Sequence, residues 1–135
     1  MAYYLDTSAA VKLVVEEAGT SALRSWLAGD GAGATPPEVV SSDLLRTELL
    51  RAVRRGAPDR IGRARQVLEA VSLLTVPSSV FERAGLLEPV GLRSLDALHV
   101  ASALELGDDL EGVVTYDDRL ADGVRALGHR VVAPG

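Results

Sequence analysis

Four acidic residues stand where a folded chain would use them for chemistry. Asp6 follows the apolar start of AYYLDTSAAVKL (residues 2–13), and Asp117 follows that of GVVTYDDRLADG (residues 112–123); Glu48 and Asp96 lie between them. If these carboxylates share one pocket, they repel one another and stay ionised together only around a cation. Oxygen ligands in a chain without cysteine select a hard ion, Mg²⁺ or Mn²⁺. Such an ion polarises a phosphoryl oxygen and activates a bound water for in-line attack.

The position of Asp6 has two interpretations. As a helix N-cap, its side chain would accept hydrogen bonds from unpaired backbone N–H groups. As a ligand, it would use the carboxyl edge of an open α/β sheet, where such folds bind their ligands. The same order of strand, acid and helix recurs at 112–123, where either Asp117 or Asp118 takes the corresponding place. This repetition favours a ligand role, with polar neighbours that orient ligands or water: Ser8 and Thr115.

Glu48 interrupts the apolar side of a helix. In SDLLRTELLRAVRR (residues 42–55), helical spacing groups five apolar residues into one arc, and Glu48 falls inside it: Leu44, Leu45, Leu49, Ala52 and Val53. Burying an unpaired carboxylate costs several kcal/mol. Glu48 therefore either joins the acidic pocket or forms a salt bridge with Arg51 or Arg55.

Asp96 begins a helix that is apolar on nearly every face, GLRSLDALHVASALEL (residues 91–106). If Ser94 caps this helix, Asp96 lies in its first turn, where the helix dipole favours a carboxylate by only about 0.3–1 kcal/mol. That gain is smaller than the cost of burial, so Asp96 is a second candidate ligand. His99, one turn further on, is expected to be a hydrogen-bonded core residue rather than a ligand.

Strands and helices alternate along the whole chain. Apolar runs of strand length occur at 3–5, 39–40, 71–76, 112–116 and 130–134, and helical segments at 8–17, 19–28, 43–55, 58–70, 78–87, 94–106 and 118–127, with a loop at 29–38. This order predicts a three-layer α/β/α sandwich around a mainly parallel sheet of about five strands. Parallel strands end at the same sheet edge, so strands 3–5 and 112–116, if neighbours, bring their acids together.

Length and composition indicate one globular domain, residues 1–135. No apolar run approaches the roughly 20 residues of a membrane span, so no membrane association is expected. The start of the chain lacks the pattern of a signal peptide and cysteine is absent, which favours a cytoplasmic location.

Positive charge gathers in one segment of an otherwise acidic chain. The net charge is −5, but residues 46–65 hold seven arginines and two acids. This cluster is either a solvated helix face or a contact surface for the phosphates of RNA or the carboxylates of a protein partner. Its proposed contact residues are Arg46, Arg51, Arg54 and Arg55.

The combined motifs resemble a known family. YLDTSAAVKL, SSDLLRTELLRAVRR, LRSLDALHVASAL and VVTYDDRLADG occur in the order and spacing of PIN-domain ribonucleases, specifically VapC-type toxins of toxin–antitoxin pairs, over essentially all 135 residues. The resemblance implies an Mg²⁺-dependent endoribonuclease with catalytic Asp6, Glu48, Asp96 and Asp117, supported by Ser8, Thr115 and Asp118. Asp6, Asp96 and Asp117 would bind the metal. It also implies a homodimer silenced by a cognate antitoxin in a heterotetramer or larger complex.

Two other functions are compatible with parts of the sequence. A phosphoaspartyl phosphotransfer enzyme also begins with a strand ending in Asp, but it requires a second Asp where this chain has Ser8. A receiver-like domain requires a lysine late in the sheet, whereas the only lysine is Lys12. A catalytically silent PIN-like interaction module would use its acids to receive a partner's arginine, but all four acids are retained.

Overall fold

A computed structural model of the chain describes residues 1–31 and 34–135. The strands are β1 (Ala2–Leu5), β2 (Val39–Ser42), β3 (Ser72–Leu74), β4 (Leu110–Val114) and β5 (Val131–Val132). The helices are α1 (Thr7–Val14), α2 (Thr20–Ala28), α3 (Leu44–Gly56), α4 (Ile61–Ala70), α5 (Ser78–Gly85), α6 (Ser94–Leu104) and α7 (Asp118–Ala126), with short 3₁₀ turns at Pro58–Arg60 and Gly107–Asp109. No helix in these described ranges is long and apolar enough to cross a membrane.

The sheet is parallel throughout, with the order β3-β2-β1-β4-β5. Its central strand β1 pairs with both β2 and β4, and Leu5 lies opposite Val114. The carboxyl ends of β1 and β4 therefore meet at one edge, as the sequence predicts.

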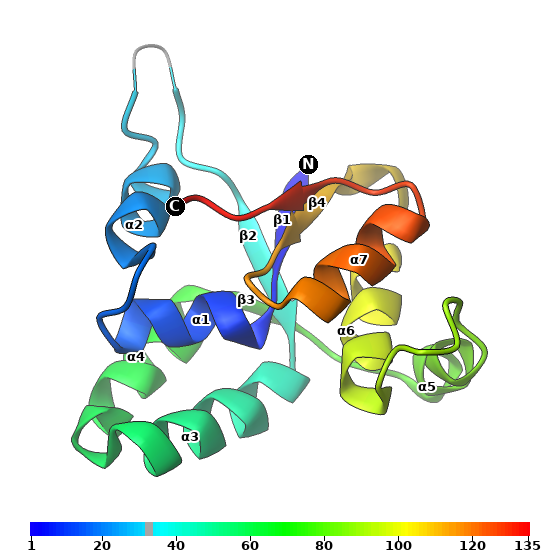
Figure 1. The fold of residues 1–135 in the computed structure, drawn as a ribbon, viewed down its shortest axis with the longest axis horizontal. Coiled ribbons are helices and arrows are strands. Elements are labelled where there is room, and N and C mark those ends of the chain that lie inside the picture. Colours follow the sequence, from blue (N-terminus) through cyan, green and yellow to red (C-terminus); the bar gives the residue numbers. More distant parts are fainter. Residues whose placement is uncertain (32–33) are drawn as a thin grey trace.

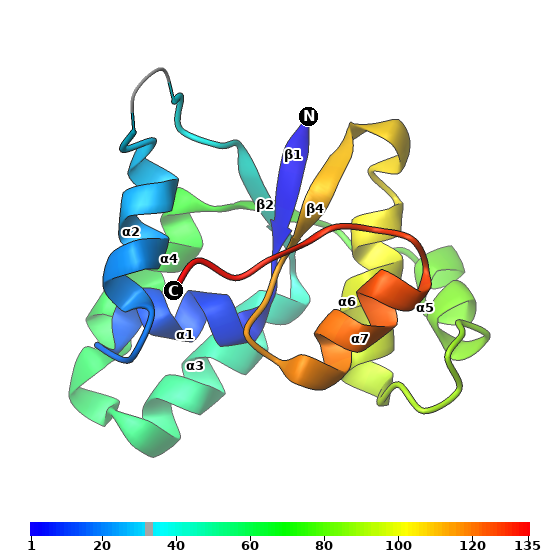
Figure 2. The same ribbon diagram turned by 45° about the horizontal axis from the view of Figure 1, so that its top comes forward.

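Helices cover both faces of this sheet. Figures 1 and 2 show α1 to α4 on one side and α5, α6 and α7 on the other. Because strand side chains alternate between faces, Leu5 joins the core beneath α1 to α4, whereas Tyr4 joins the core beneath α6 and α7. The predicted three-layer α/β/α architecture is confirmed.

The predicted boundaries differ mainly at the sheet edges. The strand expected at 71–76 is limited to Ser72–Leu74, because its partner β2 offers paired residues only as far as Ser42. The strand expected at 130–134 is limited to Val131–Val132, which pair with the end of β4. The helix expected from residue 58 begins as a 3₁₀ turn. The loop expected at 29–38 includes residues 32 and 33, which lie outside the described residues.

Candidate acidic active site

Asp6 lies at the carboxyl end of β1 and is only 5% exposed. Its Oδ2 accepts hydrogen bonds from Ser8 Oγ at 2.7 Å, Thr115 Oγ1 at 2.9 Å and the Ser8 backbone N–H at 3.2 Å. The last bond makes Asp6 the N-cap of α1. The capping interpretation is therefore correct and does not exclude the other, because Oδ1 points elsewhere and lies 3.9 Å from His99 Nε2.

Ser8 and Thr115 join the ends of the two central strands. Ser8 Oγ accepts from the Tyr116 N–H at 2.9 Å, and Thr115 Oγ1 accepts from the Asp117 N–H at 3.1 Å. Thr115 is buried, and its hydroxyl oxygen lies 3.2 Å from that of Ser8. Both side chains thus hold the Asp6 carboxylate at the junction of β1 and β4, which fits the predicted supporting role.

Glu48 reaches the same junction from α3. Leu45, Leu49 and Val53 bury one side of α3, so Glu48, on an adjacent position, is directed between α1 and α6. Its Oε1 accepts a hydrogen bond from Thr7 Oγ1 at 3.1 Å and contacts His99 Nε2. The alternative prediction, a salt bridge from Glu48 to Arg51 or Arg55, is wrong, because the Glu48 carboxylate faces His99 of α6 instead.

Asp96 lies in the first turn of α6 and is half-buried. Burial raises the pKa of its carboxyl above the usual value, and the charges of Asp117, Asp6 and Glu48 add to this against the opposing effect of His99. The structure thus places Asp96 in the field of the other three acids. Ser94 does not cap the helix: it is the first helical residue, and Arg93 stands at the N-cap without a side-chain bond.

The two adjacent acids after β4 have different environments. Asp117 caps α7, its Oδ1 accepting from the backbone N–H groups of Arg119 at 2.9 Å and Leu120 at 3.2 Å. Asp118 is the first helical residue and is exposed. Because Asp117 is also the residue whose charge acts on Asp96, the geometry favours Asp117 over Asp118 as the fourth member of the site.

His99 is buried in the centre of this group, with 2% exposure. Its Nε2 faces Glu48, and its Nδ1 lies 2.7 Å from the Tyr4 hydroxyl. Burial lowers the pKa of His99, but the hydrogen bond to Glu48 and the charge of Asp6 outweigh it, so the pKa is raised. The prediction of a hydrogen-bonded buried histidine is confirmed, but its partner Glu48 belongs to the site. The sequence signal for this role of His99 is its spacing from Asp96, because residues three apart on a helix lie on the same face.

The donor chemistry suits a hard cation, although the side chains do not enclose one. Among residues 1–31 and 34–135, no three Asp, Glu or His side chains are arranged so that they could hold a metal ion. In this arrangement Glu48 is turned to His99, and Asp117 caps α7. Burial and the charges of neighbouring acids, Asp117 foremost, raise the pKa of Asp96. A site of oxygen ligands close enough to repel one another fits Mg²⁺ or Mn²⁺.

A groove of about 630 Å³ opens beside the acids between α3 and the α5–α6 side. Its lining includes Glu48 and Thr7, together with Arg51, Arg55 and Phe81. Arg54 is exposed, and Arg46 forms an ion pair with Asp43 at 2.9 Å on the surface. The structure thus brings two of the four proposed contact arginines, Arg51 and Arg55, to the groove next to Glu48.

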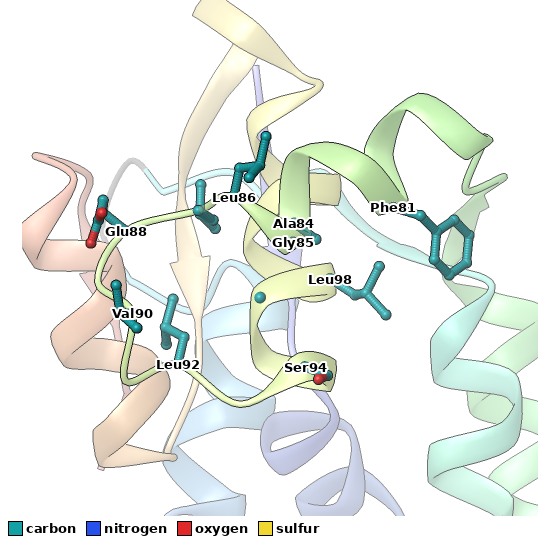
Figure 3. A pocket seen from close by; sticks show the side chains of 11 residues that line it. Phe81, Ala84, Gly85, Leu86, Glu88, Val90, Leu92, Ser94 and Leu98 are labelled. Carbon is teal, nitrogen blue, oxygen red and sulfur yellow. The ribbon is translucent and has the colours of Figure 1, made fainter.

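A second pocket, of about 500 Å³, lies between α5 and α6. Figure 3 shows Leu86, Val90 and Leu92 on the connecting segment and Phe81 on α5, with Glu88 as the acidic lining residue. The pocket is formed by other residues than the acidic group, so it is not part of the candidate site.

Comparisons with known proteins agree with this geometry. The PIN domain family model matches residues 3–125. Ribonuclease VapC46 of Mycobacterium tuberculosis (strain ATCC 25618 / H37Rv) is 43% identical over 98% of both chains. This chain belongs to the VapC group of the PIN-domain family. VapC47 of M. tuberculosis (strain CDC 1551 / Oshkosh), also named a ribonuclease, is 41% identical over 98% of this chain and 96% of its own length.

Solved structures show the same PIN-domain fold at lower identity. The crystal structure of M. tuberculosis VapC20, described as a sarcin-ricin loop cleaving toxin, superposes with a TM-score of 0.73 at 20% identity over 98% of this chain and all of its own. A toxin–antitoxin complex from Klebsiella pneumoniae gives a TM-score of 0.70 at 20% identity over 99% of this chain and 98% of the matched one.

Proposed function

We propose that this PIN domain is an endoribonuclease and the toxin of a toxin–antitoxin pair. The observation that carries the proposal is the meeting of Asp6, Glu48, Asp96 and Asp117 at one edge of the sheet, where burial and neighbouring charge raise the pKa of Asp96. The two VapC relatives at 41–43% identity are named ribonucleases, which gives RNA as the substrate. The acidic pocket is thus a phosphodiester-hydrolysing site.

In this proposal Asp6, Asp96 and Asp117 hold Mg²⁺ or Mn²⁺, and Glu48 completes the catalytic acids. The ion, when bound, polarises the phosphoryl oxygen and lowers the pKa of a water. Ser8 and Thr115 fix one oxygen of Asp6, and the other, Oδ1, faces His99 Nε2 at 3.9 Å. Asp118 lies beside this group as a supporting residue at the surface.

The proposed partners are the RNA substrate, a cognate antitoxin and a second copy of the chain. The solved toxin–antitoxin complex with the same fold supports an antitoxin partner. We propose a homodimer that forms a heterotetramer or larger complex with the antitoxin. The antitoxin must leave this complex before RNA is cut.

The decisive experiment is cleavage of total RNA by purified, antitoxin-free protein with and without Mg²⁺. The proposal requires cleavage that depends on the metal and is lost in Asp6→Asn. A protein that binds the antitoxin but cleaves no RNA with either Mg²⁺ or Mn²⁺ is instead a silent interaction module.

The chemistry predicts the ends of the RNA products. Because a metal-activated water is the nucleophile, the ribose 2′-OH is not needed, and the product carries a 5′-phosphate. Cleavage products can be tested for ligation or for digestion by a 5′-phosphate-dependent exonuclease. Products with a 2′,3′-cyclic phosphate contradict the mechanism.

The arginines of α3 predict a salt effect on RNA binding. Replacing Arg51 and Arg54 by Gln removes two exposed positive charges. Each lost phosphate contact makes the slope of log affinity against log salt less steep by about one. Binding of a short single-stranded RNA to Asp6→Asn protein, with and without the two Gln changes, measures this slope. Arg125→Gln, on α7 and also exposed, is the control. An unchanged slope assigns Arg51 and Arg54 to the antitoxin, to the dimer interface or to a solvated surface.

A further inference from the structure

Behind the acidic pocket, buried side chains form a hydrogen-bonded chain that the four acids do not include. Tyr4 on β1 donates its hydroxyl hydrogen to Ser42 Oγ at 2.9 Å, and the same hydroxyl lies 2.7 Å from Nδ1 of His99. Tyr4, Ser42 and His99 are all buried, with exposures of 0%, 0% and 2%. The imidazole is therefore fixed in position from a side remote from the pocket.

Both ring nitrogens of His99 have polar neighbours. The Tyr4 hydroxyl contacts both Ser42 Oγ at 2.9 Å and His99 Nδ1 at 2.7 Å, which fixes that side of the ring. On the other side of the ring, Nε2 faces Glu48 Oε1, with Thr7 Oγ1 at 3.4 Å and Asp6 Oδ1 at 3.9 Å. Since all three neighbours are oxygens, Nε2 contacts them favourably as a donor, and Glu48 is the nearest acceptor.

We propose that His99 is a positioning residue, which holds the Glu48 carboxylate in the acidic pocket through its Nε2–H while Tyr4 and Ser42 fix the ring. The inference deepens the proposed ribonuclease function and rests on it. Glu48 comes from α3 and lies on the apolar arc of that helix, so an internal partner is needed to keep it ionised and oriented. His99 supplies that partner from α6, on the opposite face of the sheet from the core of α3.

Nuclear magnetic resonance tests the contact without reference to activity. The chain has two histidines, so spectra of metal-free protein and of His129→Gln identify the ring N–H signals of His99. We expect a strongly downfield Nε2–H signal that moves upfield in Glu48→Gln, because an amide oxygen is a weaker acceptor than a carboxylate. An absent signal, or one that Glu48→Gln leaves unchanged, overturns the proposal.

Two variants of His99 separate positioning from packing. Asn places its amide near the position of Nδ1 and keeps the Tyr4 side, whereas Gln reaches the position of Nε2 and keeps a donor to Glu48. Loss of such a supporting partner typically lowers activity about 10- to 100-fold. We expect His99→Asn to lower kcat by about 100-fold with little change in KM, and His99→Gln to recover about tenfold of this.

Both rates are measured on the folded fraction of each variant, with His129→Gln as the unchanged control. If His99 only fills the core, the folded fraction of His99→Asn keeps the wild-type kcat, and that result overturns the proposal. If the wild type itself cleaves no RNA, the ribonuclease proposal fails, and the resonance of Nε2–H still decides whether His99 holds Glu48.

Discussion

Asp6→Asn is expected to abolish RNA cleavage while leaving the fold intact. The Asn carbonyl oxygen can take the place of Oδ2, which accepts all three hydrogen bonds from Ser8 and Thr115. The amide nitrogen then replaces Oδ1, which removes the negative charge that faces His99 and the other acids. Because supporting residues of metal sites already account for about 10- to 100-fold in activity, we expect a ligand to account for more than about 100-fold.

The comparison needs a control that changes charge without touching the site. Glu105 lies at the C-terminal end of α6, is exposed, and forms a 3.6 Å surface ion pair with Arg83. Glu105→Gln is therefore expected to leave the cleavage rate within about twofold, since Glu105 lies at the opposite end of α6 from Asp96 and surface substitutions have small effects. Initial rates on a defined RNA in Mg²⁺ compare the two variants. Asp6→Asn protein that is folded and cleaves at the wild-type rate contradicts the proposed site.

Asp96→Asn is expected to stabilise the metal-free protein and to remove its response to Mg²⁺. The pKa of Asp96 is raised by burial and by the charges of Asp117 and Asp6. A carboxyl with a raised pKa binds its proton more tightly in the folded than in the unfolded chain, so its contribution to stability is present below about pH 4 and lost as pH rises. At pH 7 the substitution removes this repulsion and raises the melting temperature; at pH 4 and below the gain disappears.

Metal reverses the sign of the effect. An ion that binds only the folded wild type adds RT ln(1 + [L]/Kd), about 2.7 kcal/mol at a hundredfold excess over Kd. For a chain of this length that corresponds to roughly 10 °C in melting temperature. Asp96→Asn is expected to lose most of this gain, so that the wild type becomes the more stable protein in Mg²⁺.

Thermal melts of both proteins are recorded in chelator and in millimolar Mg²⁺, each at pH 7 and pH 4. Each of the four conditions gives a difference in melting temperature between the wild type and Asp96→Asn. A plain first-turn acid predicts the opposite behaviour, because the helix dipole favours its charge. A mutant that is destabilised in chelator and indifferent to Mg²⁺ would therefore remove Asp96 from the site.

The sequence predicts the backbone of the site well, because it depends on local patterns. Apolar runs followed by Asp6 and Asp117 predict two strands with acids at their ends, and parallel pairing brings those ends together. The sequence does not decide whether Asp117 or Asp118 belongs to the site. That choice depends on where β4 ends, at Val114, and where α7 begins, at Asp118.

The partner of Glu48 could not be predicted for a different reason. Helical spacing identifies the face on which Glu48 lies, but it does not identify the side chain opposite. That side chain, His99, is 51 residues away in sequence and on another helix. The ring of His99 is fixed by Tyr4, which belongs to the core on one face of the sheet, whereas the next residue, Leu5, belongs to the core on the other face. The contact between Glu48 and His99 therefore depends on how the helices of the two faces meet at the end of β1.

The central place of β1 has a consequence for synthesis on the ribosome. β1 is the first strand to leave the exit tunnel, but its neighbour β4 begins only at Leu110, and Asp117 follows that strand. Asp6 therefore lacks its hydrogen-bond partner Thr115 and the neighbouring acid Asp117 until most of the domain has been translated. A nascent chain that does not yet contain Thr115 and Asp117 cannot assemble the acidic pocket. The order of strands thus delays formation of the pocket until β4 has been translated and has paired with β1.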